Sequence, residues 1–327
     1  MKILTQLMTF FIVLTINSVF AKDTLIPIRI GWQIPWATQG QLVQILKHTD
    51  ILKKNGLKAT FIGRTYGPLL NELALSKEID IVLTADQPAV ALFSKEKRWV
   101  AVGRLMYNRT LTYVLPNSKI KSLKDLKNKV IAIPIGAAAE RITLAAVKSS
   151  GLDPKKDIKV VNLGIREQIS LIKRHKGDES LGSIDALSGF DPIPAILESK
   201  GLIRPLHVGK VVSLVLMNEK FINKHKGVAT NFMRSIVDAY GYFKKNRKIS
   251  NEWFLEEAKL SSGSQSACNI AASIEPNLKS KNKKGIRVSF TTDDLRIIHE
   301  AALFMEPKLK KLVDIKKFVN NNYVNEL

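Results

Sequence analysis

The sequence predicts an α/β protein built from two lobes, and three observations lead to this prediction. The chain has 327 residues, a length that suits two domains better than one. Short apolar segments alternate along it with stretches of helical spacing, the order typical of parallel sheets covered by helices. Two of these segments, 79–84 and 130–134, run into a turn that opens a helix. In parallel sheets such turns meet at one edge, where the first N–H groups of a helix can face a bound molecule.

The first lobe begins with alternating strands and helices. Residues 26–31 have the pattern of a strand, and apolar residues between 42 and 52 mark one face of the helix that follows. The next expected elements are a strand at 58–62, a helix at 68–76, a strand at 79–84, a helix at 88–94 and a strand at 99–105. This order predicts a parallel sheet with helices on both faces.

A break at Pro116-Asn117-Ser118 marks the first crossing between lobes. The second series consists of strands at 130–134, 158–163 and 184–187 and helices at 138–149, 166–173 and 193–199. Segment 211–217 then returns to the first lobe, whose last amphipathic helix is expected to end at Pro307. We therefore expect a discontinuous first lobe, 22–112 and 212–327, and a second lobe at 113–211.

The first 21 residues have the features of a cleaved secretory signal peptide. Lys2 precedes an apolar run at 3–20, and small residues lie at the last and third-last positions before Lys22. This pattern predicts a periplasmic protein. The alternative is an uncleaved membrane anchor, because the run is close to the ~18-residue lower limit for a membrane span.

Composition argues against several classes of function. The net charge of +22 would suit a nucleic-acid partner, but an exported chain does not meet nucleic acid. Its lysines also lack an aromatic or glycine-rich pattern beside them, so we expect no such partner and a solvated basic surface. Cys268 is the single cysteine, which excludes an intrachain disulfide and indicates an inert thiol.

The sequence carries no recognisable catalytic or metal motif. Its five histidines do not have metal-ligand spacing, and a Gly-x-Ser-x-Gly elbow, a phosphate-binding loop and a cysteine pair are all missing. We therefore expect a protein that is not an enzyme and that needs no cofactor or metal.

Nine short segments, taken in order, resemble one family. They are IRIGWQ at 28–33, LKKNGL at 52–57, YGPLLNELA at 66–74, IDI at 79–81, ADQPA at 85–89, KSLKDLK at 121–127, KV at 129–130, IGAAAE at 135–140 and GFDP at 189–192. Together they resemble periplasmic solute-binding proteins of ABC importers, the branch that binds nitrate, aliphatic sulfonates, taurine and pyrimidine precursors. The resemblance covers roughly residues 26–210.

The resemblance implies a type II periplasmic binding protein fold, with a mainly parallel sheet in each lobe and the ligand cleft between them. It implies a monomer that captures a small polar solute and delivers it to an ABC permease in the inner membrane. Three alternatives stay open: a ligand-sensing adaptor, a pyrimidine-metabolism enzyme relative on the same fold, and a surface adhesin that uses the positive charge.

Six positions of the first lobe are candidates for contact with the solute. They are Gln33, Trp36, Tyr66, Gly67, Asp86 and Gln87. Each follows a predicted strand or opens a predicted helix, where amides, aromatic faces and close backbone approach are available. Packing or helix-start chemistry explains some of them equally well: Trp36 as a loop aromatic, Gly67 before Pro68, and Asp86 as the cap of a helix that begins near Pro88.

Six further candidates belong to the second lobe. They are Gly136, Ala137, Ala138, Glu140, Phe190 and Asp191. The resemblance implies a hydroxyl-bearing Gly-Ser-Ser turn in sulfonate binders, where this chain has alanines, and Glu140 stands where the family often has histidine. Acidic residues at three helix openings favour a neutral or amine-bearing solute, such as a taurine-like zwitterion or an aminopyrimidine. Arg109 and Arg141 are candidates for anion recognition or for plain surface residues.

Overall fold

The structure, a computed structural model, describes residues 25–260, 263–325 and 327. The expected signal peptide at 1–21 lies outside these residues. No helix in the described part of the chain is long and apolar enough to cross a membrane.

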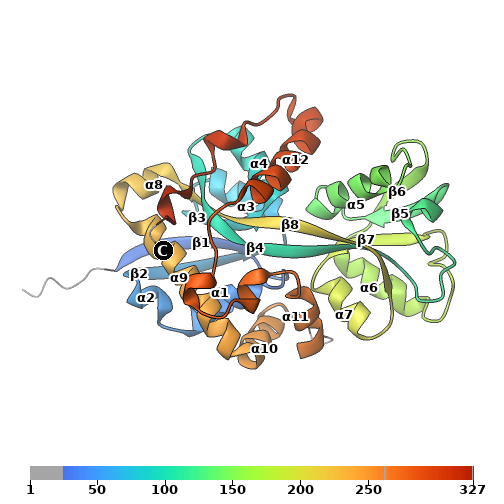
Figure 1. Cartoon of the computed structure of the whole chain (residues 1–327), viewed down its shortest axis with the longest axis horizontal. Helices are drawn as coiled ribbons and strands as arrows, with labels where there is room; N and C mark the ends of the chain where they lie inside the picture. Colours follow the sequence, from blue (N-terminus) through green and yellow to red (C-terminus); the bar gives the residue numbers. More distant parts are fainter. Residues whose placement is uncertain (1–24, 261–262, 326) are drawn as a thin grey trace, which may run out of the picture.

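The strands form one continuous mixed sheet in the order β2-β1-β3-β8-β4-β7-β5-β6. β1 pairs in parallel with β2 and β3, and β5 pairs in parallel with β6 and β7. The two long strands β4 (Trp99–Val114) and β8 (Arg204–Asn218) are antiparallel to each other and to their outer neighbours. They run from one half of the sheet into the other (Figure 1). The predicted two-lobed α/β fold is confirmed, and the two lobes share these long strands.

The first lobe contains the strands β1 to β3. The bounds of its N-terminal elements are β1 Ile26–Gln33, α1 Gln39–His48, α2 Ile51–Lys54, β2 Leu57–Arg64, α3 Gly67–Leu75, β3 Ile81–Ala85 and α4 Asp86–Lys95. After β8 the chain adds α8 Glu219–Lys224, α9 Val228–Lys245, α10 Arg247–Glu257, α11 Gln265–Ala271 and α12 Thr292–Leu309. Short 3-10 turns at Pro276–Lys279, Lys283–Gly285, Ile315–Lys317 and Asn321–Tyr323 fill the intervals.

The second lobe contains the strands β5 to β7. Its elements are a 3-10 turn at Leu123–Leu126, β5 Lys129–Ile133, α5 Ala138–Ser149, β6 Ile158–Asn162, α6 Ile165–Arg174, β7 Ala186–Phe190 and α7 Ile193–Ser199. The turn at Leu123 is held by a capping box, in which Ser122 and Asp125 satisfy each other's backbone N–H groups.

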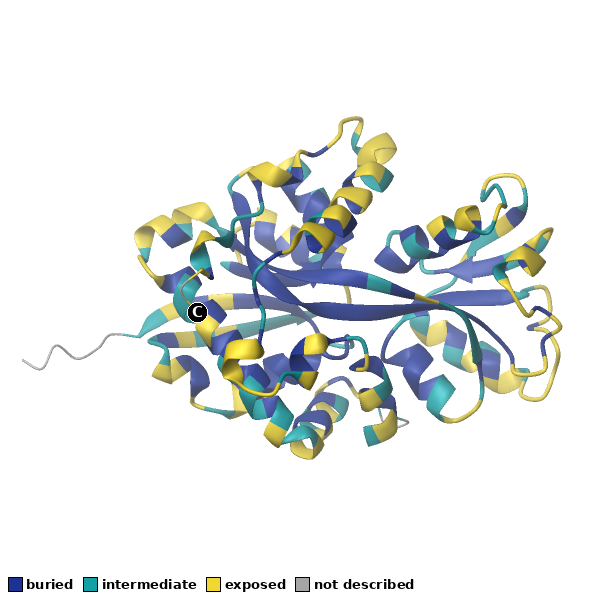
Figure 2. Cartoon of the chain, viewed as in Figure 1, coloured by how far each residue is buried: buried dark blue, intermediate teal, exposed yellow. Residues whose placement is uncertain are grey.

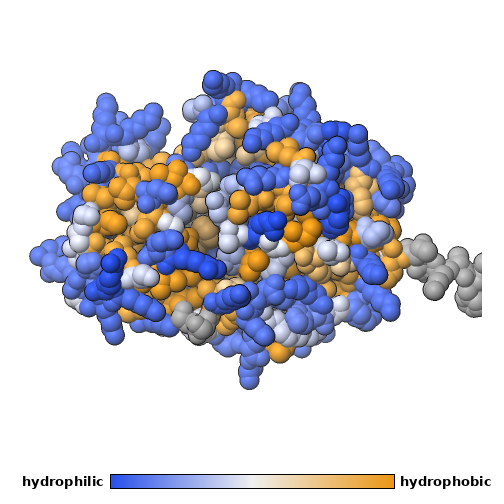
Figure 3. Space-filling model, turned by 180° about the vertical axis from the view of Figure 1, so that it is seen from behind, coloured by the Kyte–Doolittle hydropathy of each residue, from blue (hydrophilic) through white to orange (hydrophobic). Residues whose placement is uncertain are grey.

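Helices cover both faces of the sheet, as Figure 1 shows. In the first lobe α3, α4 and α12 lie on one face and α1, α9 and α10 on the other; α5 and the pair α6 and α7 cover the second lobe. β4 is buried along its whole length and β8 over residues 211–217, and exposed residues lie on the outer faces of the helices (Figure 2). On the opposite side of the molecule, apolar side chains form patches between hydrophilic ones (Figure 3).

Two expectations about local structure were wrong. The strand expected at 99–105 is longer, because β4 continues to Val114 through two irregular pairings between Ala101 and Met106. Pro307 does not end the last helix, which continues to Leu309; a proline this close to the helix end disturbs only the final turn. The polar segment between α10 and α12, for which the sequence indicated no periodic element, contains the short helix α11.

The α11 helix joins the apolar core beneath the second lobe. Its Ala267, Cys268 and Ala271 are buried in one cluster with Ile193 and Ile196 of α7. Figure 1 shows the two helices side by side. A segment that comes late in the chain therefore packs against the second lobe.

Candidate functional site

A small cavity lies between the two lobes, with a volume of about 30 Å³. The first lobe contributes Gln33, Trp36, Tyr66, Gly67, Pro68, Ala85 and Pro88, the long strand β4 contributes Thr110, and the second lobe contributes Gly136, Ala137, Ala138, Ala139 and Phe190. A single buried water molecule needs about 10–15 Å³ of such space. The lobes are thus nearly closed on each other here, and a ring-sized molecule needs more room.

Aromatic side chains form much of the cavity wall. The rings of Trp36 and Phe190 meet edge to face across the two lobes, with centroids 5.9 Å apart. Tyr66 is 46% exposed and Ile135, in the facing turn of the second lobe, is 52% exposed. Tyr66 thus lines the cavity and reaches solvent, whereas Ile135 is exposed beside the lining residue Gly136.

Three buried polar atoms of cavity-lining residues have no hydrogen-bond partner among the described residues. They are Gln33 Oε1, Trp36 Nε1 and Thr110 Oγ1. Buried polar groups are almost always hydrogen-bonded, so unpartnered groups that share a cavity are available to a bound molecule. They offer an acceptor, a donor and a hydroxyl that can do either.

The turn before α5 was expected to present bare N–H groups to an anion, and the structure modifies this expectation. Gly136 adopts the left-handed conformation with φ of 90°. Its N–H donates to Glu140 Oε2 at 2.7 Å, and the N–H of Ala137 donates to Pro134 O at 3.2 Å. The amides of Ala138 and Ala139, which both line the cavity, have no acceptor within the described part of the chain. The available donors thus belong to the first two residues of α5, just after the turn that contains Gly136.

Asp86 binds a cation of the opposite lobe. Its carboxylate accepts a hydrogen bond from Arg141 at 2.7 Å, and both side chains are almost completely buried. The same carboxylate accepts from the N–H groups of Gln87 and Val212, at 2.7 and 3.3 Å. Burial raises the pKa of Asp86, and the charge of Arg141 acts against this rise. The interpretation of Asp86 as the cap of α4 was wrong. Asp86 is the first residue of this helix, and Ala85 lies in the cap position.

The neighbouring Gln87 also contacts the second lobe. Its Nε2 donates to the carbonyl oxygen of Gly136 at 2.9 Å, while its Oε1 is buried and finds no partner among the residues that the structure describes. Gln87 therefore ties the turn before α5 to the start of α4.

Asp191 and Arg109 form a second buried pair. Arg109 donates to Asp191 at 2.7 and 3.3 Å and to Glu198 at 2.7 Å. Asp191 also accepts from the N–H of Ala195, in the first turn of α7. Burial raises the pKa of Asp191, and Arg109 counteracts the rise. The pair holds the start of α7 against β4.

The structure brings together most of the residues singled out from the sequence. Eight of the twelve line the cavity: Gln33, Trp36, Tyr66, Gly67, Gly136, Ala137, Ala138 and Phe190. Asp86, Gln87, Glu140 and Asp191 do not line it, because their side chains bind other parts of the chain. The expected acidic cleft is therefore absent among the described residues, since the three acids face cations or backbone N–H groups.

Sequence reasoning missed five of the residues that line the cavity: Pro68, Ala85, Pro88, Thr110 and Ala139. Of these, Thr110 lies inside a long buried strand, so no turn or helix start marked it. The available signal was a polar residue shortly before the expected crossing between lobes.

The fold and the shared cavity define a protein of the periplasmic binding protein class of folds. Its structure is similar to the periplasmic aliphatic sulphonate binding protein SsuA from Escherichia coli, with a TM-score of 0.72 and 20% identity over 90% of this chain and 92% of that chain. It is similar to a ligand binding component of an ABC-type import system from Staphylococcus aureus, with a TM-score of 0.68 and 16% identity over 92% and 98% of the two chains. The desulfurization enzyme DszB shares the fold as well, with a TM-score of 0.65 and 12% identity over 92% and 98%.

The chain belongs to the NMT1/THI5-like family, whose sequence profile matches residues 50–248. A Haemophilus influenzae protein provisionally named a thiamine biosynthesis protein is 25% identical over 179 residues, which are 54% of this chain and 53% of that protein. The chain thus spans about half the length of the curated relative it matches.

Proposed function

We propose that this chain is the solute-binding component of an ABC importer. It would close two lobes, 22–112 with 212–327 and 113–211, on a small polar solute, and present the closed form to a permease in the inner membrane. Export by the signal peptide at 1–21 would place it in the periplasm as a monomer. The family and fold support this proposal.

The observation that carries the proposal is the cavity itself. It draws on the loops after β1 and β2, on β4 and on the turn before α5, and it contains unpartnered polar atoms beside aromatic rings. Aromatic walls with a few placed polar groups are the usual composition of a small-molecule site. Contacts from both lobes stabilise closure to the extent that they are better in the closed form.

The lining narrows the solute chemistry. Each charged group that sequence analysis placed near the cavity is paired within the protein, so the lining is uncharged among the described residues. We infer a solute with a flat or alkyl body between Trp36, Tyr66 and Phe190. Its polar end would face the amides of Ala138 and Ala139 or the amide of Gln33. Organosulfonates, taurine and aminopyrimidines satisfy this description, whereas nitrate has no ring or alkyl portion to pack between the aromatic side chains.

Binding without chemistry is the second part of the proposal. None of the five histidines lines the cavity, and Cys268 lies between α11 and α7. Burial raises the pKa of the Cys268 thiol to about 12, which keeps it protonated and unreactive.

Two measurements test the proposal. Native mass spectrometry of freshly purified protein looks for a retained small molecule, and thermal unfolding is then followed with alkanesulfonates, taurine, nitrate and aminopyrimidines. A solute at 100 times its Kd stabilises the folded state by about 2.7 kcal/mol. The cavity variant Tyr66→Ala should lose the shift, whereas Leu303→Ala, an equally exposed residue on α12, should keep it. No bound molecule and no shift with any solute would refute the proposal.

A further inference from the structure

A row of direct polar contacts joins the two lobes beside the cavity. Arg141 of α5 binds Asp86 of α4 at 2.7 Å, with 4% and 0% of the two side chains exposed. Next to it, Lys308 of α12 lies 3.5 Å from Glu140, and Glu300 of α12 lies 4.0 Å from Arg141. We call these three contacts the latch. α4 and α12 pack together in the first lobe, whereas α5 belongs to the second.

The latch does not use the cavity-lining side chains. Asp86, Glu140, Arg141, Glu300 and Lys308 are all absent from the lining. Its contacts can therefore form with or without a solute in the cavity. Closure here leaves only about 30 Å³ between the lobes, so the latched form has to open before a ring-sized solute enters.

We propose that the latch is a gate that favours the closed over the open arrangement of the lobes, and that Arg141 is its central positioning residue. Arg141 is almost fully buried and is the residue that binds both α4 and α12 across the cleft. Because a solute enters only the open form, the observed association rate is proportional to the fraction of molecules that are open. The latch lowers this fraction and therefore slows association. Because it also stabilises the closed form around a solute, it slows release.

The opening of the gate can be measured without any solute. Pulsed electron spin resonance between spin labels at Lys95→Cys and Lys156→Cys, in a Cys268→Ala background, reports the distance between the lobes. Both lysines are exposed, one at the end of α4 and one before β6. We expect one short distance in the parent protein and a longer, broader distribution in the double variant Asp86→Asn/Arg141→Met.

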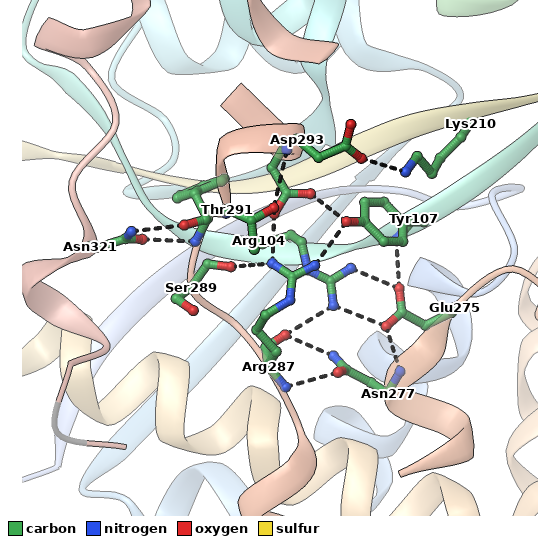
Figure 4. A network of polar contacts seen from close by, with 12 residues as sticks. Arg104, Tyr107, Lys210, Glu275, Asn277, Arg287, Ser289, Thr291, Asp293 and Asn321 are labelled. Carbon is green, nitrogen blue, oxygen red and sulfur yellow. Dashed lines mark hydrogen bonds and ion pairs between the residues drawn. The ribbon is translucent and has the colours of Figure 1, made fainter. Parts of the chain in front are cut away.

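A matched control separates opening from general damage. Arg104 and Glu275 form an equally buried ion pair, with contacts of 2.9 and 3.0 Å, that lies within the first lobe (Figure 4). The double variant Arg104→Met/Glu275→Gln should lower stability and leave the distance between the lobes unchanged.

A milder variant covers the case in which the buried pair cannot be altered without loss of folding. Lys308 is 49% exposed, so Lys308→Gln should fold and should shift the distances in the same direction by a smaller amount. Lys47→Gln removes a pair with Glu257 inside the first lobe and should shift nothing. Unchanged distances in both latch variants, or an equal change in the controls, would overturn the proposal.

The kinetic consequence rests on the proposed function and is tested separately. With a solute found by the binding screen, stopped-flow fluorescence should show association and dissociation rates that both rise in the latch variants, with a smaller change in Kd. Arg141→Lys should restore part of the parent rates. If the latch variants show a longer distance between the lobes but no solute binds, the gate is supported and the proposed solute capture is refuted. If the latch variants release a solute faster but show no change in the association rate or in the distance between the lobes, the gate is refuted and solute capture is supported.

Discussion

Glu140 accepts a hydrogen bond from the N–H of Gly136 at 2.7 Å, so a carboxylate of the chain occupies one of the backbone donors of the turn before α5. The interaction reaches back from the first turn of α5, where negative charge is favoured by the helix dipole. It places a fixed negative charge close to the free amides of Ala138 and Ala139. The relationship makes Glu140 a candidate determinant of which solutes the cavity accepts.

Replacement of Glu140 should therefore improve the binding of anionic solutes. Glu140→Ala frees the Gly136 amide and removes the charge, so we expect the Kd for a sulfonate to fall by roughly fivefold, about 1 kcal/mol. Glu140→Gln removes the charge and can keep the hydrogen bond, and its effect should be smaller. Isothermal titration calorimetry with a sulfonate and a neutral analogue checks this. An equal change for both solutes would contradict the role of charge.

Gly67 is expected to be essential for the packing of α3 on α4. A Cβ atom at this position would lie 2.4 Å from Pro88 Cγ and 2.8 Å from Thr84 Oγ1. Gly67→Ala should therefore destabilise the protein by about 1–3 kcal/mol. Gly241→Ala is the control, because its Cβ meets no atom within 4 Å and alanine favours a helix. Urea unfolding should show a loss only in the first variant.

Local patterns predicted the parts of the site that depend on local structure. Gln33, Tyr66 and Gly136 follow strands or open helices, and such positions can be found from apolar periodicity and turn residues. The pairing of Asp86 with Arg141 spans 55 residues of sequence and two lobes. A single sequence carries no signal for such a pair, so Asp86 was assigned to the solute when it binds the protein.

Position 136 should require glycine because of its backbone conformation, and not because a side chain would collide with neighbouring atoms. Its φ is 90° and an added Cβ would meet no atom within 4 Å. Gly136→Ala should cost about 1–2 kcal/mol of stability through strain in the left-handed region. Gly151→Ala, at φ of 91° and also with open space, should cost a similar amount. Only the first should weaken solute binding, because its turn lines the cavity; calorimetry at matched folded fraction distinguishes the two.

Asp294 should make the protein sensitive to acid. Burial acts on it most strongly and would raise its pKa, but hydrogen bonds from Tyr107 and Thr291 and the charge of Arg287 hold the pKa below its ordinary value. A carboxylate with a lowered pKa stabilises the folded state above its unfolded pKa, and this stability is lost as the pH falls through the folded value.

Asp294→Asn should therefore cost about 1–3 kcal/mol near neutral pH, and the gap to the parent protein should narrow as the pH falls below about 4. Urea unfolding across a pH series measures this. The control Asp50→Asn removes only an exposed pair with Lys54 and should change little at any pH. Parallel curves for Asp294→Asn and the parent, with no convergence in acid, would show that the carboxylate of Asp294 contributes no acid-sensitive stability.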